Sequence, residues 1–372
     1  MTACRRTKKF NHKTTINTMP NSYSECAVAL LRELIATPST SREEGAAADL
    51  MESALSSAGF SPRRDKNNVW AIAPGYDPSR PTLLLNAHLD TVRPVASWTR
   101  PPFSADIEGD RLYGLGSNDC GGGLVSLLKV FIHLSGTSQH YNLVFLASAE
   151  EEVSGANGLS HVLPLLPRID MALVGEPTGM QPAVAEKGLM VVDMVSHGKS
   201  GHAARGEGVN ALYLMLDDLL WLREHRFEKV SPLLGPTLLN VTVLNAGTQH
   251  NVIPDTCQAI IDVRTNELYT NEEVFDIIRS HVRSEVKARS FRLKSSSISL
   301  DHPVVKRCVA MGKQPFGSPT LSDQALMPFP SMKMGPGESS RSHSADEFIC
   351  LHEIENAIEQ YIRLLDGVKL DG

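Results

Sequence analysis

An imidazole and a carboxylate stand two residues apart at the end of an apolar stretch. His88 and Asp90 directly follow residues 83–87, and side chains two residues apart in a strand lie on the same face. A metal-bound histidine usually donates its other ring N–H to a carboxylate, so we predict that Asp90 orients His88 as a metal ligand. A polar turn at a strand end would contain the same two residues, and the pair alone does not separate these alternatives.

Three further segments carry carboxylates where apolar runs end. Asp119 lies in the glycine-rich stretch 112–123, Glu150–Glu152 follow the apolar run 143–147, and Glu176 follows another apolar run. A phosphate loop would need a Lys-Ser/Thr ending or a correctly spaced GxGxxG, and Asp119 would repel a phosphate. We therefore predict that the glycines bend the chain around a metal-ligating carboxylate. The three glutamates form either a solvated acidic turn or a metal ligand beside a catalytic base.

A second imidazole, His343, lies far along the chain in Ser342–Asp346. Two histidines and several carboxylates without paired thiolates form a ligand set for a two-metal hydrolytic site, most suitably zinc. Such sites hold their ions about 3.5–4 Å apart around a shared water, whose pKa falls far enough for attack on a carbonyl near neutral pH.

The composition indicates an ordinary soluble protein that is long enough for two domains. Of 372 residues, 42% are hydrophobic and 21% are charged. The formal net charge of -6 argues against nucleic-acid and membrane partners and favours a small-molecule substrate. The six cysteines form no CxxC pairs, so we expect a reducing, cytoplasmic location without a disulfide framework. No apolar run approaches the roughly 20 residues of a membrane span.

Hydrophobic periodicity predicts an α/β domain first. A first helix is expected from Glu25 to about Pro38, a second after a capping box of Ser41 and Glu44, and a third over 124–134. Strands are expected over 69–73, 83–87, 143–147 and 171–174. Strands that alternate with helices predict a mostly parallel sheet with helices on both faces and a site at the carboxyl ends of the strands.

After Pro177 the order of elements changes. Strands over 189–195, 238–243 and 259–263 with helices over 210–222 and 271–286 predict a small α+β sandwich, and a final helix begins near Leu351. We therefore expect a discontinuous catalytic domain, residues 25–180 and 295–372, with residues 181–294 inserted. Residues 1–24 are basic without any acid, and we expect a disordered tail there.

The order and spacing of these polar residues resemble those of the M20 family of metallopeptidases and amidohydrolases over nearly the whole chain from Glu25. Further matches, notably to its acetylornithine deacetylase branch, are Gly175–Thr178, Glu186–Gly188, Gly201–Ala203, Gln249–Pro254 and Gly335–Gly337. The resemblance implies that Asp119 bridges two ions, with His88 and Glu176 completing one site and Glu152 and His343 the other.

The resemblance also implies roles around these ligands. Glu151 would be the general base, passing a proton from the water to the departing amine, a transfer typically worth about 10²–10⁴-fold. Asp90 would support the site without binding a metal. The peptide bond between Asp119 and Cys120 would be cis.

The inserted domain resembles the family's dimerisation lid, which implies a homodimer. His202 matches the lid histidine that reaches the partner active site and stabilises the tetrahedral oxyanion; otherwise it would cap the turn before the next helix. Asn251 and Arg264 match positions that hold the substrate's polar groups and carboxylate, which a guanidinium grips with two hydrogen bonds. Lys187 and Arg205 are further substrate-binding candidates that could instead be solvated surface charges.

The ligand set implies a cytoplasmic, metal-dependent amide hydrolase with two zinc ions that cobalt can replace. The resemblance alone implies the substrate, Nα-acetyl- or Nα-succinyl-L-ornithine, and with it a step of arginine synthesis. A dipeptidase or carboxypeptidase, or a succinyl-diaminopimelate desuccinylase, would share the ligands and remains an alternative. A catalytically silent binding protein would need a lost base or ligand, but Glu151 and all five ligand positions are present.

Overall fold

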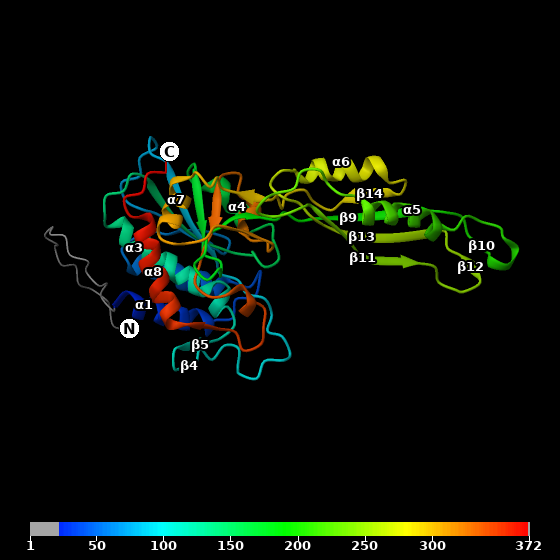
Figure 1. Ribbon diagram of the computed structural model, residues 1–372. Coiled ribbons are helices and arrows are strands. Elements are labelled where there is room, and N and C mark those ends of the chain that lie inside the picture. The colour runs from blue at the N-terminus through cyan, green and yellow to red at the C-terminus, as the bar shows by residue number, and fades with distance from the viewer. Residues whose placement is uncertain (1–21, 371–372) are drawn as a thin grey trace.

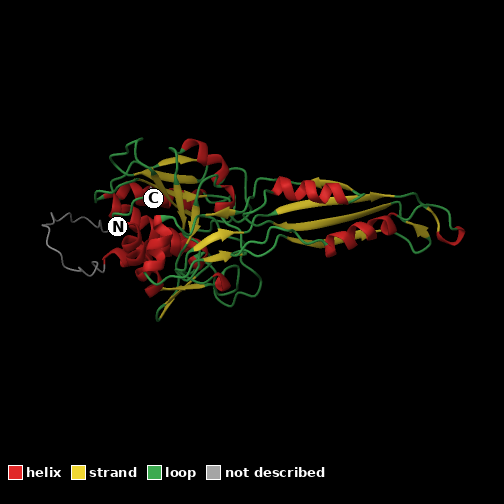
Figure 2. Ribbon diagram, turned by 45° about the horizontal axis from the view of Figure 1, so that its top comes forward, coloured by secondary structure: helices red, strands yellow, loops and turns green. Residues whose placement is uncertain are grey.

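The computed structural model describes residues 22–370, which form a larger unit and a long, narrow arm that extends from it (Figures 1 and 2). The first helix, α1 (Ser22–Ile35), begins inside the range assigned to the N-terminal tail. The remainder of that predicted tail, residues 1–21, lies outside the described residues. Within residues 22–370, every helix is too short or too polar to cross a bilayer.

The larger unit is built on a sheet with the strand order β1-β2-β6-β3-β7-β17-β8-β15 and with β16 beside β8. Its strands are β1 (Arg63–Asp65), β2 (Asn68–Ile72), β3 (Thr82–His88), β6 (Asn142–Ser148), β7 (Met171–Val174), β8 (Ala183–Glu186), β15 (Ser296–Ser297), β16 (Phe316–Ser318) and β17 (Ser331–Lys333). The central strands β6, β3, β7 and β17 run parallel, and all their residues are buried. Continuous burial is typical of parallel strands covered on both faces, and the predicted fold class is confirmed.

Alternate residues of the sheet face two different layers of helices. Leu83 and Leu85 of β3 belong to a core with α1, α2 (Gly45–Ser57), α3 (Gly122–Ser135), α7 (Pro303–Ala310) and α8 (Leu351–Leu365). Leu84 belongs to a second core with α4 (Leu159–Val162) on the opposite face. The period-2 alternation of a strand therefore places helices on both sides of the sheet.

The start of α2 differs from the prediction, because Ser41 and Glu44 do not form a capping box. The N-cap is Glu44, without a side-chain capping bond. Ser41 Oγ instead donates to Asp90 Oδ2 at 2.7 Å, and Glu44 Oε1 accepts the Glu150 N–H at 3.1 Å. Contacts with two distant loops have replaced the local cap.

The arm contains an antiparallel sheet with the strand order β11-β13-β9-β14. Its strands are β9 (Met190–His197), β11 (Leu238–Ala246), β13 (Thr256–Arg264) and β14 (Glu285–Ala288), and its helices are α5 (Ala211–Glu224) and α6 (Asn271–His281). Met190, Val192 and Met194 of β9 pack against both helices, so the helices cover one face. The ribbon of β10 (Gly201–His202) and β12 (Val252–Ile253) lies at the far end of the arm (Figure 1).

The helix predicted over 271–286 was too long, and its last part is a turn followed by β14. Asp218 on α5 is buried, and its carboxylate accepts the N–H groups of Arg283 and Ser284 at 3.0 and 2.9 Å. These charge-assisted bonds fix the turn after α6.

The two units meet where β8 and β15 pair with each other in the large sheet. Since β8 lies inside the range predicted for the insertion, we propose that the chain leaves the larger unit after residue 186 and returns before residue 296. Residues 187–295 thus form the arm described above, and we call them the lid.

A small sheet of β4 (Ile107–Glu108), β5 (Arg111–Tyr113) and β18 (Phe348–Cys350) completes the larger unit. Strand β5 leads into the Asp119 loop, and β18 follows the His343 loop. Their pairing therefore ties together two chain segments that are more than 200 residues apart in sequence.

Candidate metal centre and active site

Five polar side chains meet at one edge of the large sheet. His88 ends β3, Glu152 follows β6, and Glu176 follows β7. These three strands are parallel neighbours, so their carboxyl ends lie at the same edge. The loop before α3 adds Asp119, and the loop before β18 adds His343.

Asp119 lies between the two histidines and directs one carboxylate oxygen toward each. His88 Nε2 is 3.2 Å from Asp119 Oδ1 and 3.5 Å from Glu176 Oε1. His343 Nε2 is 3.5 Å from Asp119 Oδ2 and 2.9 Å from Glu152 Oε2. The five predicted ligands thus form two groups that share one carboxylate, an arrangement suited to two ions with a bridging ligand.

The local chemistry fits cations at this place. Among the described residues, Glu152 Oε1 and Glu176 Oε1 are buried without a hydrogen-bond partner. Burial, helped by the charge of Asp119, raises the pKa of Glu176 to about 8. The hydrogen bond to Glu152 raises the pKa of His343 to about 9. The raised pKa values of these groups show that closely spaced carboxylates repel one another here. Divalent ions would supply the positive charge that offsets this repulsion.

Glu151 lies beside this cluster. One of its carboxylate oxygens is within 4.8 Å of ligand atoms of His88 and Glu152. Burial raises the pKa of Glu151 well above its usual range; His88 opposes the effect, and the Glu176 carboxylate adds to it. A carboxyl group with a raised pKa can accept and return a proton near neutral pH, as a general base must.

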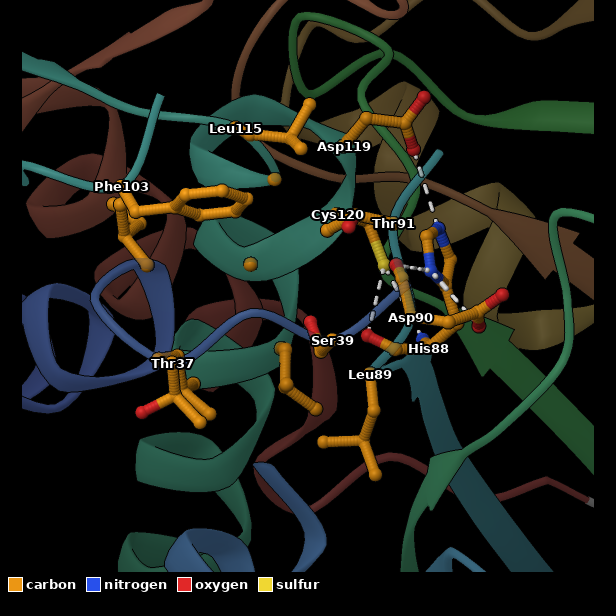
Figure 3. Close-up of a pocket in the computed structure, with 15 residues that line it drawn as sticks. Thr37, Ser39, His88, Leu89, Asp90, Thr91, Phe103, Leu115, Asp119 and Cys120 are labelled. Carbon is orange, nitrogen blue, oxygen red and sulfur yellow. Dashed lines mark hydrogen bonds and ion pairs between the residues drawn. The ribbon is translucent and has the colours of Figure 1, made fainter. Parts of the chain in front are cut away.

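Asp90 supports His88 in a way that differs from the prediction. His88 Nδ1 contacts the Asp90 backbone oxygen at 2.8 Å, whereas the nearer carboxylate oxygen, Oδ1, is 3.6 Å away (Figure 3). The Asp90 carboxylate instead accepts the N–H groups of Glu151 and Glu152 at 3.0 and 3.1 Å. One residue therefore orients the histidine through its backbone and the acidic loop through its side chain.

Cys120 packs directly against the His88 strand. The His88 N–H donates to its sulfur at 3.2 Å, and the peptide bond between Asp119 and Cys120 is cis, as the resemblance implied. Burial raises the pKa of the Cys120 thiol far above its usual range. Cys120 is therefore a small buried packing residue in the protonated form.

The glycines after Cys120 permit a close approach of backbones. A Cβ on Gly123 would lie 1.7 Å from the Gly175 carbonyl oxygen. Since Gly175 directly precedes Glu176, the absence of a side chain at Gly123 lets the start of α3 pack against the loop that carries this ligand.

The sequence reasoning missed Glu347, which holds the Asp119 loop in place. Its buried carboxylate accepts the N–H groups of Gly116, Asn118 and Asp119 at 3.2, 2.8 and 2.9 Å. The sequence signal for it was an acidic pair, Asp346 and Glu347, three and four residues after His343.

The predicted substrate-binding residues fall into two places. Lys187 and Arg264 lie near the junction with the lid: Lys187 Nζ donates to the Pro236 carbonyl at 2.8 Å, and Arg264 makes two hydrogen bonds to Asp262 at 2.8 and 3.1 Å. Burial lowers the pKa of Lys187, and the charge of Arg264 lowers it further.

The remaining candidates lie at the far end of the lid. His202 belongs to β10, its Nδ1 accepts the Ala204 N–H at 3.2 Å, and the Ala203 N–H donates to the Asn251 carbonyl oxygen at 3.0 Å. The capping interaction considered for His202 is therefore present. These residues and Arg205 are exposed. Strands β10 and β12 lie at the far end of the arm, away from the large sheet whose edge carries the predicted metal ligands (Figure 1).

Comparisons with known proteins agree with this arrangement. An acetylornithine deacetylase of Proteus mirabilis (strain HI4320) is 28% identical over 372 residues, which covers 91% of this chain and 96% of that enzyme. Succinyl-diaminopimelate desuccinylase 2 of Ruegeria sp. (strain TM1040) is 29% identical over 69% of each chain.

Solved structures share the fold. The M20 family metallo-carboxypeptidase Sso-CP2 of Sulfolobus solfataricus has a TM-score of 0.70 at 19% identity and covers 91% of this chain and 98% of its own. The YXEP protein of Bacillus subtilis, described as a dinuclear metal-binding peptidase, has a TM-score of 0.71 at 18% identity, over 93% and 98%. The family model for peptidase family M20/M25/M40 matches residues 84–367, and the chain belongs to this family of metallo-hydrolases.

Proposed function

We propose that this protein hydrolyses the amide bond of an Nα-acyl-L-ornithine, releasing L-ornithine and a carboxylate as a step of arginine synthesis. The observation that carries the proposal is the position of Asp119 between two imidazole–carboxylate groups, with Glu151 beside them. The acyl-ornithine class is supported by relatives named acetylornithine deacetylase, whose matches extend over most of this chain.

His88, Asp119 and Glu176 would hold one divalent ion, and Asp119, Glu152 and His343 the other. Zinc suits these nitrogen and oxygen ligands, and cobalt is expected to replace it. When bound, such ions supply Lewis acidity toward a water molecule and a carbonyl group.

Glu151 would move the proton in the reaction. Its carboxylate takes a proton from the attacking water and delivers it to the departing amine nitrogen, which leaves as a neutral group. The N–H groups that Asp90 holds fix the backbone of Glu151, and thereby the direction in which the carboxylate points.

A homodimer would bring His202 to a second active site. Exposed apolar side chains line α5 and β11 of the lid, including Tyr213 at 68%, Leu216 at 44% and Leu244 at 45% exposure. Apolar side chains gathered on neighbouring elements are typical of a protein–protein interface. A partner's lid docked there would carry His202 toward the oxyanion and Asn251 toward the substrate.

The decisive experiment compares kcat/KM for Nα-acetyl-L-ornithine and Nα-succinyl-L-ornithine with values for succinyl-diaminopimelate and for dipeptides. We expect an acyl-ornithine to be the best substrate, and the ratio of the two values names the acyl group. Preference for succinyl-diaminopimelate or a dipeptide would refute the ornithine assignment while leaving the hydrolytic site intact.

A further inference from the structure

Three metal-ligating side chains meet on the small sheet, outside the proposed active site. Asp110 lies in the turn between β4 and β5, Cys350 ends β18, and His352 lies in the first turn of α8. Cys350 pairs with Arg111 across β18 and β5, and the Leu351 N–H donates to the Asp110 carbonyl oxygen at 2.7 Å. Backbone hydrogen bonds therefore hold the three residues close together independently of their side chains.

The side chains converge on the Asp110 carboxylate. Its Oδ1 accepts the His352 backbone N–H at 3.2 Å, and its Oδ2 makes a short hydrogen bond with His352 Nδ1. Burial raises the pKa of Asp110, but the contacts with His352 and the nearby Cys350 thiol outweigh it and hold that pKa below its usual range. One ligand atom of each residue lies within 4.8 Å of the others.

We propose that Asp110, Cys350 and His352 bind a divalent metal ion of the zinc class. Thiolate, imidazole and carboxylate together select zinc-like ions over magnesium and calcium, which prefer oxygen ligands alone. Tetrahedral bonds of about 2.0–2.3 Å require ligand atoms roughly 3–4 Å apart, which small rotations provide. The side chains of Asp110 and His352 are 50% and 59% exposed, so water can supply a fourth ligand.

Binding replaces the contacts to the carboxylate with bonds to the ion. The Cys350 S–H bond breaks and its proton passes to solvent. His352 binds through Nδ1, so the proton that Nδ1 donates to the Asp110 carboxylate leaves that nitrogen and is carried by solvent to Nε2, which keeps the imidazole neutral. Burial and the Glu353 carboxylate raise the pKa of the Cys350 thiol, whereas Arg341 and Arg111 oppose this effect, so it is the positive ion that must displace the thiol proton. The charge of Arg341 is itself balanced by two hydrogen bonds to Glu353, at 2.7 and 3.1 Å.

The position of this site gives it a structural consequence. Strand β5 continues into the Asp119 loop, and β18 comes directly from the His343 loop. An ion that joins Asp110 to Cys350 and His352 would clamp the two strands together. It would therefore hold two segments of the active site in register without taking part in the reaction.

Cadmium titration of the full-length, chelator-treated protein tests the proposal, because a cadmium–thiolate bond gives an ultraviolet charge-transfer band. We expect the band in the wild type, its loss in Cys350→Ser, and its retention in the matched control Cys120→Ser, whose thiol lies beside the active-site ligands. His352→Ala should weaken cadmium binding about tenfold or more.

Zinc content provides a second readout that is independent of catalysis. After dialysis against metal-free buffer, wild type should retain one zinc equivalent more than Cys350→Ser, with both proteins folded by circular dichroism. Equal zinc content, or a cadmium band that survives in Cys350→Ser and disappears in Cys120→Ser, would overturn the proposal.

Discussion

Replacing Glu347 should damage the active site without touching a metal ligand. In Glu347→Ala the N–H groups of Gly116, Asn118 and Asp119 lose their acceptor. A buried donor left without a partner costs about 1–3 kcal/mol. The two shorter bonds, at 2.8 and 2.9 Å, contribute most, so we expect the free energy of unfolding to fall by about 2–6 kcal/mol.

Glu347→Gln is the matched control, because it keeps the shape and one oxygen acceptor. We expect it to cost about 1–2 kcal/mol. Urea unfolding followed by circular dichroism measures both values, and equilibrium dialysis measures metal affinity. Affinity should fall in Glu347→Ala, because the backbone of Asp119 is no longer held. An unchanged unfolding midpoint and metal affinity in Glu347→Ala would refute the reasoning.

Three further perturbations address the base, the packing and the dimer. Glu151→Gln should lower kcat by about 10²–10⁴-fold with metal content unchanged, and a fully active variant would show that another group is the base. Gly123→Ala should destabilise the fold and disturb Glu176, because its Cβ would lie 1.7 Å from the Gly175 oxygen; a wild-type thermal midpoint would contradict this. His202→Ala should be inactive alone, yet co-expression with Glu151→Gln should restore about a quarter of wild-type turnover if the histidine acts across a dimer, and no recovery would argue for action within one chain.

The sequence predicted the site best where its polar residues directly follow buried strands. Residues 83–87 and 171–174 predicted their strands closely, and parallel pairing then forced His88 and Glu176 to one edge. The ends of these two strands were therefore enough to predict that His88 and Glu176 meet, whereas the parts of Asp119 and His343 were implied by the family resemblance.

Contacts between distant loops could not be predicted in this way. Ser41 and Glu44 match a local capping pattern, but the folded chain offers them Asp90 and Glu150 as partners. Glu347 acts on backbone groups more than 220 residues away, a relation that has no local periodicity. The turn that ends α6 likewise depends on Asp218 of another helix, which explains the overlong predicted helix.

Metal-dependent release of L-ornithine tests the central claim most directly. Nα-acetyl-L-ornithine and Nα-succinyl-L-ornithine would be incubated with zinc-loaded protein, with the same protein after complete chelation, and again after zinc or cobalt is restored. We predict turnover of at least one substrate, its loss on chelation, and its recovery with either metal. Turnover that persists in metal-free protein, or folded metal-loaded protein that hydrolyses neither substrate, would contradict the account.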